Sequence, residues 1–142
     1  MAGTLEVKGK IAYVSSDPFI STGSILDNIL FGERYDHDRL EKVLELCQLK
    51  KDLELYPDNI ATVIGEKGLN ISIGQRTKIS LARAIYSQAS IYLFDDPLGN
   101  LDRKVGDKIF NSCIKDYLKD KLRILVSHHI YYMKKSEKIL YL

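Results

Sequence analysis

The amino-acid sequence predicts an α/β protein built on a parallel β-sheet. Two continuous apolar runs, at residues 91–94 and 122–126, each end at polar residues, and such runs are typical of strands buried on both faces. A helical pattern lies between the two runs, which gives the strand–helix–strand order of a parallel sheet with crossover helices. The length of 142 residues suits one domain.

The amino-terminal part predicts two short strands and one short helix. Residues 4–7 and 10–14 are rich in apolar and β-branched side chains and flank Gly9, so they are expected to be strands. The turn-like residues 21–24 offer caps for a helix over residues 25–30.

Two longer helices are expected next. Apolar residues recur at helical spacing from Leu40 to Cys47, and Asp36 or Asp38 can cap the helix that contains them. A second helix begins near Ser72. Its apolar face consists of Ile79, Ala82, Ile85 and Tyr86.

The last third of the chain continues the alternation of strands and helices. The helix between the two apolar runs presents Val105, Ile109, Phe110, Cys113, Ile114 and Tyr117 on one side. Residues 139–142 predict a final strand.

Composition argues against several classes of protein. Lys and Arg number 21 against 19 Asp and Glu, and this balance of +2 is too small for a face that binds nucleic acid. No run approaches the ~18 apolar residues of a membrane span, and the amino end lacks the apolar core of a signal peptide. Cys47 and Cys113 are too few for a disulfide framework or a zinc site and are expected in the core, which favours a reducing cytosolic setting.

Side chains at the predicted strand ends indicate phosphate chemistry. Asp95 and Asp96 follow one apolar strand and His128 follows the next, and parallel sheets carry their chemistry beyond the carboxyl ends of strands. There Asp95 can reach a hydrated magnesium ion, Asp96 can polarise a water, and His128 can contact the same water or a phosphate. The helix that starts at Ser72 offers N–H groups and a positive dipole end to an anion. Together these features predict a site for nucleotide phosphates.

Each of these features also has a purely structural interpretation. Asp95 and Asp96 before Pro97 can form a turn with a helix cap. Ser72 can be a plain N-cap, and His128 can belong to an exposed loop. The order and spacing of the whole set favour the functional interpretation.

Five segments of the chain are similar to sequence motifs that occur together in one protein family. Residues 64–76 are similar to a signature loop and its lead-in, 91–97 to a Walker B strand, 99–102 to a D-loop, 126–128 to a switch-histidine segment, and 23–32 to the stretch after the Q-loop of exporters. On these motifs the chain resembles the nucleotide-binding domain of an ATP-binding-cassette (ABC) transporter. Residues 110–114 and 134–140 make it most similar to the first such domain of the C subfamily, which includes the multidrug-resistance-associated proteins and the cystic fibrosis chloride channel.

The resemblance implies a P-loop NTPase-like ABC core with a helical subdomain. Residues 1–142 would be a partial domain, with 1–35 and 90–142 in the ATPase core and 36–89 in the helical subdomain. ATP and Mg²⁺ are the implied cofactors, both expected only in the complete domain. The implied partners are a second nucleotide-binding domain and the transmembrane domains of the same transporter, at the cytoplasmic face of a membrane where ATP hydrolysis drives export.

The resemblance also implies roles for single residues. Asp95 would hold magnesium, Asp96 occupies the position of the catalytic carboxylate, and His128 would contact the γ-phosphate. The residues expected to face nucleotide or to join the two sites of a dimer are Ser72, Gly74, Gln75 and Asp102, with Ser16 at the Q-loop position.

The chain departs from the family pattern at several points. It has no G-x-x-x-x-G-K-[ST] phosphate loop, so Met1 is expected to begin a fragment that alone binds ATP poorly and does not hydrolyse it. Ser16 replaces the Q-loop glutamine and Asp96 the catalytic glutamate, and both side chains reach less far. Ile73 replaces the first signature glycine, and its β-branched side chain should obstruct a close approach of backbone to phosphate.

Two other functions stay open at this point. A regulatory module could retain the fold without catalysis, and Ser16, Ile73 and Asp96 favour that hypothesis. A soluble ABC ATPase that acts on DNA or the ribosome is the other, but the exporter-like residues 19–32 and the modest charge speak against it.

Overall fold

A parallel β-sheet organises the molecule. The computed structural model describes residues 4, 6–65 and 70–140. In it β1 (Ile11–Val14), β4 (Ile91–Asp95) and β5 (Leu122–Val126) form a three-stranded sheet in the order β1–β4–β5, with each neighbouring pair parallel. The predicted α/β class is confirmed, and both apolar runs of the second half are strands.

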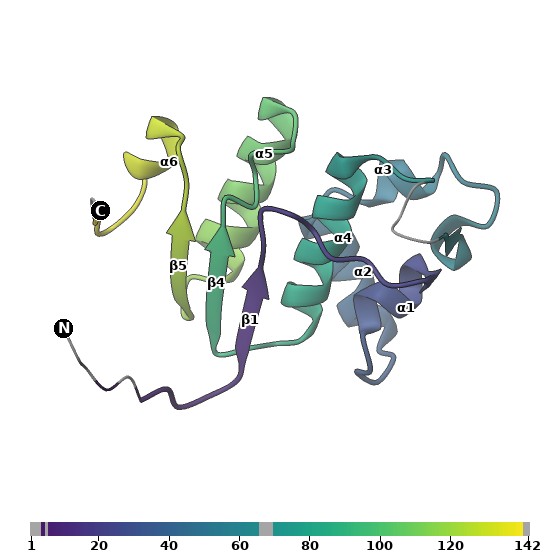
Figure 1. The fold of residues 1–142 in the computed structure, drawn as a ribbon, viewed down its shortest axis with the longest axis horizontal. Coiled ribbons are helices and arrows are strands. Elements are labelled where there is room, and N and C mark those ends of the chain that lie inside the picture. The colour runs from purple at the N-terminus through teal and green to yellow at the C-terminus, as the bar shows by residue number, and fades with distance from the viewer. Residues whose placement is uncertain (1–3, 5, 66–69, 141–142) are drawn as a thin grey trace.

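The register of this sheet brings the three carboxyl ends together. Val14 pairs with Phe94, and Asp95 at the end of β4 lies opposite Val126 at the end of β5. The three arrowheads in Figure 1 accordingly point to the same edge of the sheet. The loops that follow the strands therefore begin side by side.

Helices cover one face of the sheet. α4 (Ile73–Tyr86) precedes β4 and packs against β1, and α5 (Arg103–Ile109) continues as the π-helix η3 (Phe110–Tyr117) before β5. Side chains that point to this face, such as Tyr92 and Phe94, are 1% exposed.

The opposite face of the sheet is exposed, which differs from the prediction that the strands are buried on both faces. The apolar runs predicted strands buried on both faces, but Tyr13 is 59% exposed and Ile124 is 52% exposed. These two residues pair with the same position of β4, Leu93, so they share one face. No described element packs over that face, which explains the exposure.

The segment between β1 and β4 is mostly helical. It contains α1 (Ile25–Leu30), α2 (His37–Leu46), α3 (Lys50–Leu53), η1 (Asn59–Ala61) and the antiparallel pair β2 (Gly23–Ser24) and β3 (Val63–Ile64). Ser24 forms a capping box with Asp27 at the start of α1, and Asp36 caps α2 by accepting from the N–H of Arg39. Both predicted helices are confirmed, and Figure 1 shows α1–α4 gathered beside the sheet.

Two predicted strands are wrong in the described residues. Thr4, Glu6 and Val7 belong to no strand, and neither do Ile139 and Leu140. Leu5 and residues 141–142 lie outside the described residues, as do residues 66–69 of the predicted signature lead-in. A strand needs a neighbour for its backbone hydrogen bonds, and no described strand lies beside either segment.

The two cysteines meet in the core although they are distant in sequence. Cys47 follows α2 and Cys113 lies in η3, and both are free and fully buried. A hydrogen bond with Cys113, together with burial, raises the pKa of the Cys47 thiol well above its usual value. The expected core position of both residues is confirmed.

None of the helices in the described part of the chain has the length and apolar character that a membrane span needs.

The Tyr86 hydroxyl ties the end of α4 to the connection before α2. It donates to the carbonyl of Arg34 at 2.7 Å and accepts from the N–H of Asp36 at 2.8 Å, and Tyr86 has no exposed surface. Removing a buried partner leaves the other groups without a hydrogen bond.

We therefore expect Tyr86→Phe to lower the free energy of unfolding by about 1–3 kcal/mol, measured by denaturant unfolding. Tyr35→Phe is the control, because Tyr35 is 57% exposed, and a change below about 0.5 kcal/mol is expected there. Equal effects of the two variants would contradict the role of the Tyr86 hydroxyl.

Candidate functional site

The edge where β1, β4 and β5 end carries the predicted carboxylates. Asp95 is the last residue of β4 and is half-buried. The hydroxyl of Tyr13 in β1 donates to Asp95 Oδ2 at 3.3 Å, on the face of the sheet that the described helices leave open. This long hydrogen bond leaves most of the acceptor capacity of the Asp95 carboxylate for another ligand.

Asp96 begins a tight turn immediately after β4. Its N–H donates to the carbonyl of Val126 at 3.0 Å, its carbonyl accepts from the N–H of Gly99 at 3.2 Å, and its φ of 41° is left-handed. A Cβ at Gly99 would collide with Asp96 Oδ2, so the glycine makes room for this carboxylate.

The other oxygen of the Asp96 carboxylate is buried without a donor. Among the described residues Asp96 Oδ1 has no hydrogen-bond partner. An unsatisfied buried acceptor is unfavourable, so the turn favours a ligand that brings a donor, such as a metal-bound water. A magnesium ion bound through water and phosphate fits these residues in that respect.

Asn100 connects the turn after β4 to the loop after β1. Its side-chain amide Nδ2 donates to the carbonyl of Ser16 at 2.9 Å. A Cβ at Gly74 would lie 3.4 Å from the Asn100 carbonyl oxygen, so the start of α4 lies against the same turn. Ser16, Asn100 and Gly74 thus bring three segments together that are far apart in sequence.

Both the Ser72 cap and the Asp102 cap are present. Ser72 Oγ accepts from the N–H of Gln75 at 3.2 Å, and Gln75 Oε1 accepts from the N–H of Ser72 at 2.9 Å, which is a reciprocal capping box. Gln75 Oε1 also accepts from the hydroxyl of Tyr56 at 2.9 Å, so its side chain is held within the chain. Asp102 accepts from the N–H of Lys104 at 2.9 Å and caps α5.

The surface of the α4 start is exposed. Ser72 is exposed, and Ile73 beside it is 45% exposed. This turn is therefore accessible to a second molecule, with the Ile73 side chain projecting from it.

His128 lies in the exposed loop between β5 and α6 (Ile130–Met133). Tyr132 anchors α6: its ring centroid lies 4.6 Å from that of Phe110, and its hydroxyl packs over Gly106, where a Cβ would be 3.0 Å away. Burial and the neighbouring Asp107 raise the pKa of Tyr132 to about 12, so the phenol stays neutral at ordinary pH. The loop of His128 is thereby held over α5.

The described His, Cys, Asp and Glu side chains do not form a metal site made of protein ligands alone. Within the described part of the chain there is no group of three or more His, Cys, Asp or Glu that could hold a metal ion. Magnesium typically uses one or two carboxylates and takes its other ligands from water and phosphate, so Asp95 fits such an ion only together with a nucleotide.

Sequence reasoning missed three contacts at this edge. Tyr13, Gly99 and Asn100 contact Asp95, Asp96 and Ser16 respectively. The glycine three residues after Asp96 is a turn signal that could have indicated its role. Nothing in the sequence indicates the Tyr13 and Asn100 contacts, because each joins residues 82 or 84 positions apart.

Comparison with known proteins gives consistent matches. The family model described as ABC transporter matches residues 3–99. ATP-binding cassette sub-family C member 4 of Mus musculus is 47% identical over 141 residues, which cover 99% of this chain and 11% of that protein. ABC transporter C family member 12 of Dictyostelium discoideum is 44% identical over 131 residues, covering 92% and 10%, and C family member 9 of Arabidopsis thaliana is 42% identical over 140 residues, covering 99% and 9%. The chain spans about a tenth of the length of these relatives.

The packing of Asp96 against Gly99 gives a test of this turn. We expect Gly99→Ala to lower the free energy of unfolding by about 1–3 kcal/mol, because the new methyl group displaces the carboxylate. Gly74→Ala is the control, because its Cβ would meet only an ordinary contact at 3.4 Å.

A double-mutant cycle separates this contact from general strain. In an Asp96→Ala background, Gly99→Ala should become less destabilising by about 1 kcal/mol, measured by urea unfolding. Strict additivity of the two substitutions would show that the carboxylate does not lie against Gly99.

Proposed function

Since this chain belongs to the ABC transporter family and is similar to C-subfamily members along its length, we propose that it works within a nucleotide-binding domain whose ATP binding and hydrolysis drive export across a membrane. The observation that carries the proposal is the meeting of three loops at one edge of the sheet. Asp95, Asp96 and His128 leave the sheet at this edge, and Asn100 joins them to Ser16.

Each predicted site residue has a role in this proposal. Asp95 would hold Mg²⁺, Asp96 would accept a proton from the attacking water, and His128 would contact the γ-phosphate. When bound, ATP supplies the phosphoanhydride bond and Mg²⁺ neutralises charge on its phosphates. The protein's part is to position these groups and to place charge where the transition state needs it.

The exposed start of α4 would meet a partner domain. Ser72 and Gly74 would face the nucleotide bound to the partner domain, and Gln75 would support the Ser72 cap. Asp102 would help to join the two nucleotide sites of the pair of domains. In this proposal residues 36–89 form a helical subdomain, and residues 1–35 and 90–142 belong to the ATPase core. The transmembrane domains of the same transporter would be the other partner, with this domain on the cytoplasmic side.

A second candidate function is a regulatory domain that binds nucleotide without efficient hydrolysis. The specific observation in its favour is the Asp96 carboxylate, which is held back against Gly99 with one oxygen buried. Asp96 also reaches less far than glutamate by one methylene, roughly 1.5 Å. A displacement of ~1 Å can lower a rate by ~10²-fold.

The proposal predicts weak binding of Mg-ATP at this edge by the 142 residues alone. Because the sequence has no phosphate loop, we expect a Kd of about 1 mM or weaker, measured by NMR titration of the chain. Amide shifts should be confined to residues 15–17, 95–102 and 127–129. Asp95→Asn should abolish the difference between titrations with and without Mg²⁺.

Asp120→Asn is the matched control, because Asp120 is an exposed carboxylate just before β5, away from this edge, and should leave the titration unchanged. Binding with a Kd below about 10 μM would contradict the expected weakness. Shifts confined to other residues at saturating Mg-ATP would contradict the site itself.

A further inference from the structure

The segment that follows α6 carries an exposed serine among lysines. Three Ser or Thr side chains of the sequence have a Lys or Arg within two residues, namely Thr77, Ser80 and Ser136. Thr77 is 1% exposed and Ser80 is 7% exposed, and both lie within α4. Ser136 is exposed, and residues 136–140 belong to no helix or strand. Of these three hydroxyls, only that of Ser136 is therefore accessible to an enzyme that modifies side chains.

The charges beside Ser136 are mostly positive. Lys134 and Lys135 precede it and Lys138 follows it, with one carboxylate, Glu137, in between. All four of these side chains are exposed. Complementary charge decides which peptides an enzyme selects. This stretch therefore suits an enzyme whose peptide-binding groove is acidic.

The Ser136 hydroxyl stabilises the end of α6. It donates to the carbonyl of Tyr132 at 3.0 Å, one helical turn back. The neighbouring Lys135 ammonium donates to the hydroxyl of Tyr131 at 2.6 Å and to Asn111 Oδ1 in η3 at 3.1 Å. These contacts hold the end of a helix of only four residues in place.

We propose that Ser136 is a phosphorylation site for a serine/threonine protein kinase that selects basic peptides, and that its phosphate loosens α6. In the transfer, Ser136 Oγ attacks the γ-phosphorus of ATP held by the kinase, and the bond from that phosphorus to the bridging oxygen breaks. The hydroxyl proton passes to the carboxylate base of the kinase, and ADP leaves. This inference does not depend on the proposed function, because the kinase supplies the ATP.

The phosphate removes contacts that hold α6. An esterified Oγ has no proton to donate to the Tyr132 carbonyl. The phosphate carries a charge of about −2 at the carboxyl end of a helix, where negative charge is unfavourable, and it attracts Lys135 away from its present partners. Because α6 directly follows the loop of His128, the modification also changes how that loop is held.

The site itself is tested by treating the chain with ATP and the catalytic domain of protein kinase C, which selects basic peptides. We expect about one phosphate per chain, located at Ser136 by mass spectrometry, and Ser136→Ala should abolish its incorporation. Ser112→Ala is the control, because Ser112 is exposed but has no Lys or Arg within two residues, and it should leave incorporation unchanged. No incorporation, or phosphate only at other residues, would overturn the proposal.

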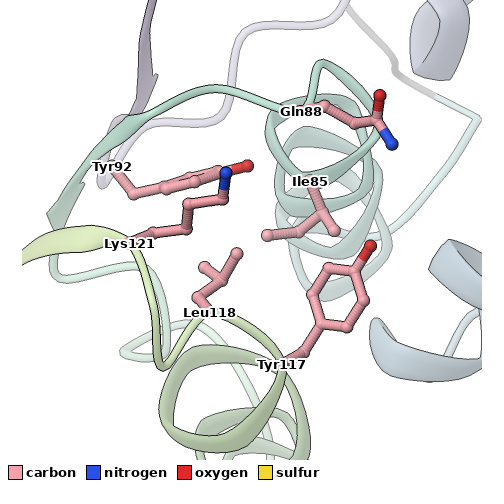
Figure 2. Close-up of a pocket in the computed structure, with 6 residues that line it drawn as sticks. All are labelled: Ile85, Gln88, Tyr92, Tyr117, Leu118 and Lys121. Atoms are coloured by element: carbon pink, nitrogen blue, oxygen red, sulfur yellow. The ribbon is translucent and has the colours of Figure 1, made fainter.

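Recognition by the flanking lysines has its own test. Lys134→Gln together with Lys138→Gln should lower kcat/KM for phosphorylation by about 10-fold or more. The control is Lys119→Gln together with Lys121→Gln, which removes the same charge from exposed lysines before β5 and should change kcat/KM less than about twofold. Figure 2 shows Lys121 beside the end of η3, whereas Ser136 lies beyond the other end of β5. Equal losses in the two double variants would overturn recognition by the flanking lysines.

Amide hydrogen exchange tests the loosening of α6. The N–H groups of Lys134 and Lys135 donate to the carbonyls of Ile130 and Tyr132. At full phosphorylation both amides should exchange at least about 5-fold faster, while the amides of β4 keep their rates. Unphosphorylated Ser136→Ala should accelerate them less, because it removes the hydrogen bond without adding charge. Unchanged exchange at both amides after phosphorylation would overturn the loosening.

Discussion

The parallel register of β1, β4 and β5 is the constraint on which the rest of the structure depends. Parallel strands require long crossover connections, and these supply α4 and the continuous α5–η3 helix. The same register forces the three loops that carry Ser16, Asp96 and His128 to begin at one edge. The position of the candidate site is therefore a consequence of chain direction, and the residue types in the three loops decide what it could bind.

Small residues and single side chains complete the site once the loops are together. Gly99 leaves room for the Asp96 carboxylate, and the start of α4 at Gly74 lies against the carbonyl of Asn100. The Asn100 amide then fixes the loop of Ser16 through one hydrogen bond. Such contacts are individually worth about 1 kcal/mol, but they decide the relative positions of the loops that carry the candidate site residues.

The sequence predicts those parts of this structure that depend on local chemistry. Ser24, Asp36 and Ser72 mark helix starts correctly, because a cap is formed by residues within one turn. The placement of Asp95 and His128 at a common edge was also predictable, because it follows from strand–helix–strand order. The strands predicted at residues 4–7 and 139–142 are absent from the described residues. A strand forms only beside a partner strand, and the composition of a segment does not show whether it has one. The Asn100–Ser16 contact and the π-helix depend on packing between distant segments, and no local sequence pattern indicates them.

The loops after β1 and β4 meet through Asn100 at the edge that carries the carboxylates. Nuclear Overhauser effects in the ¹⁵N-labelled chain measure this most directly. We expect cross-peaks from the Asn100 side-chain amide protons to residues 16 and 17, together with amide contacts that link Val14 to Phe94 and Phe94 to Leu125. If the strand contacts have another register, or if the Asn100 amide shows contacts only to its own turn, the three loops do not share one edge and do not form one site.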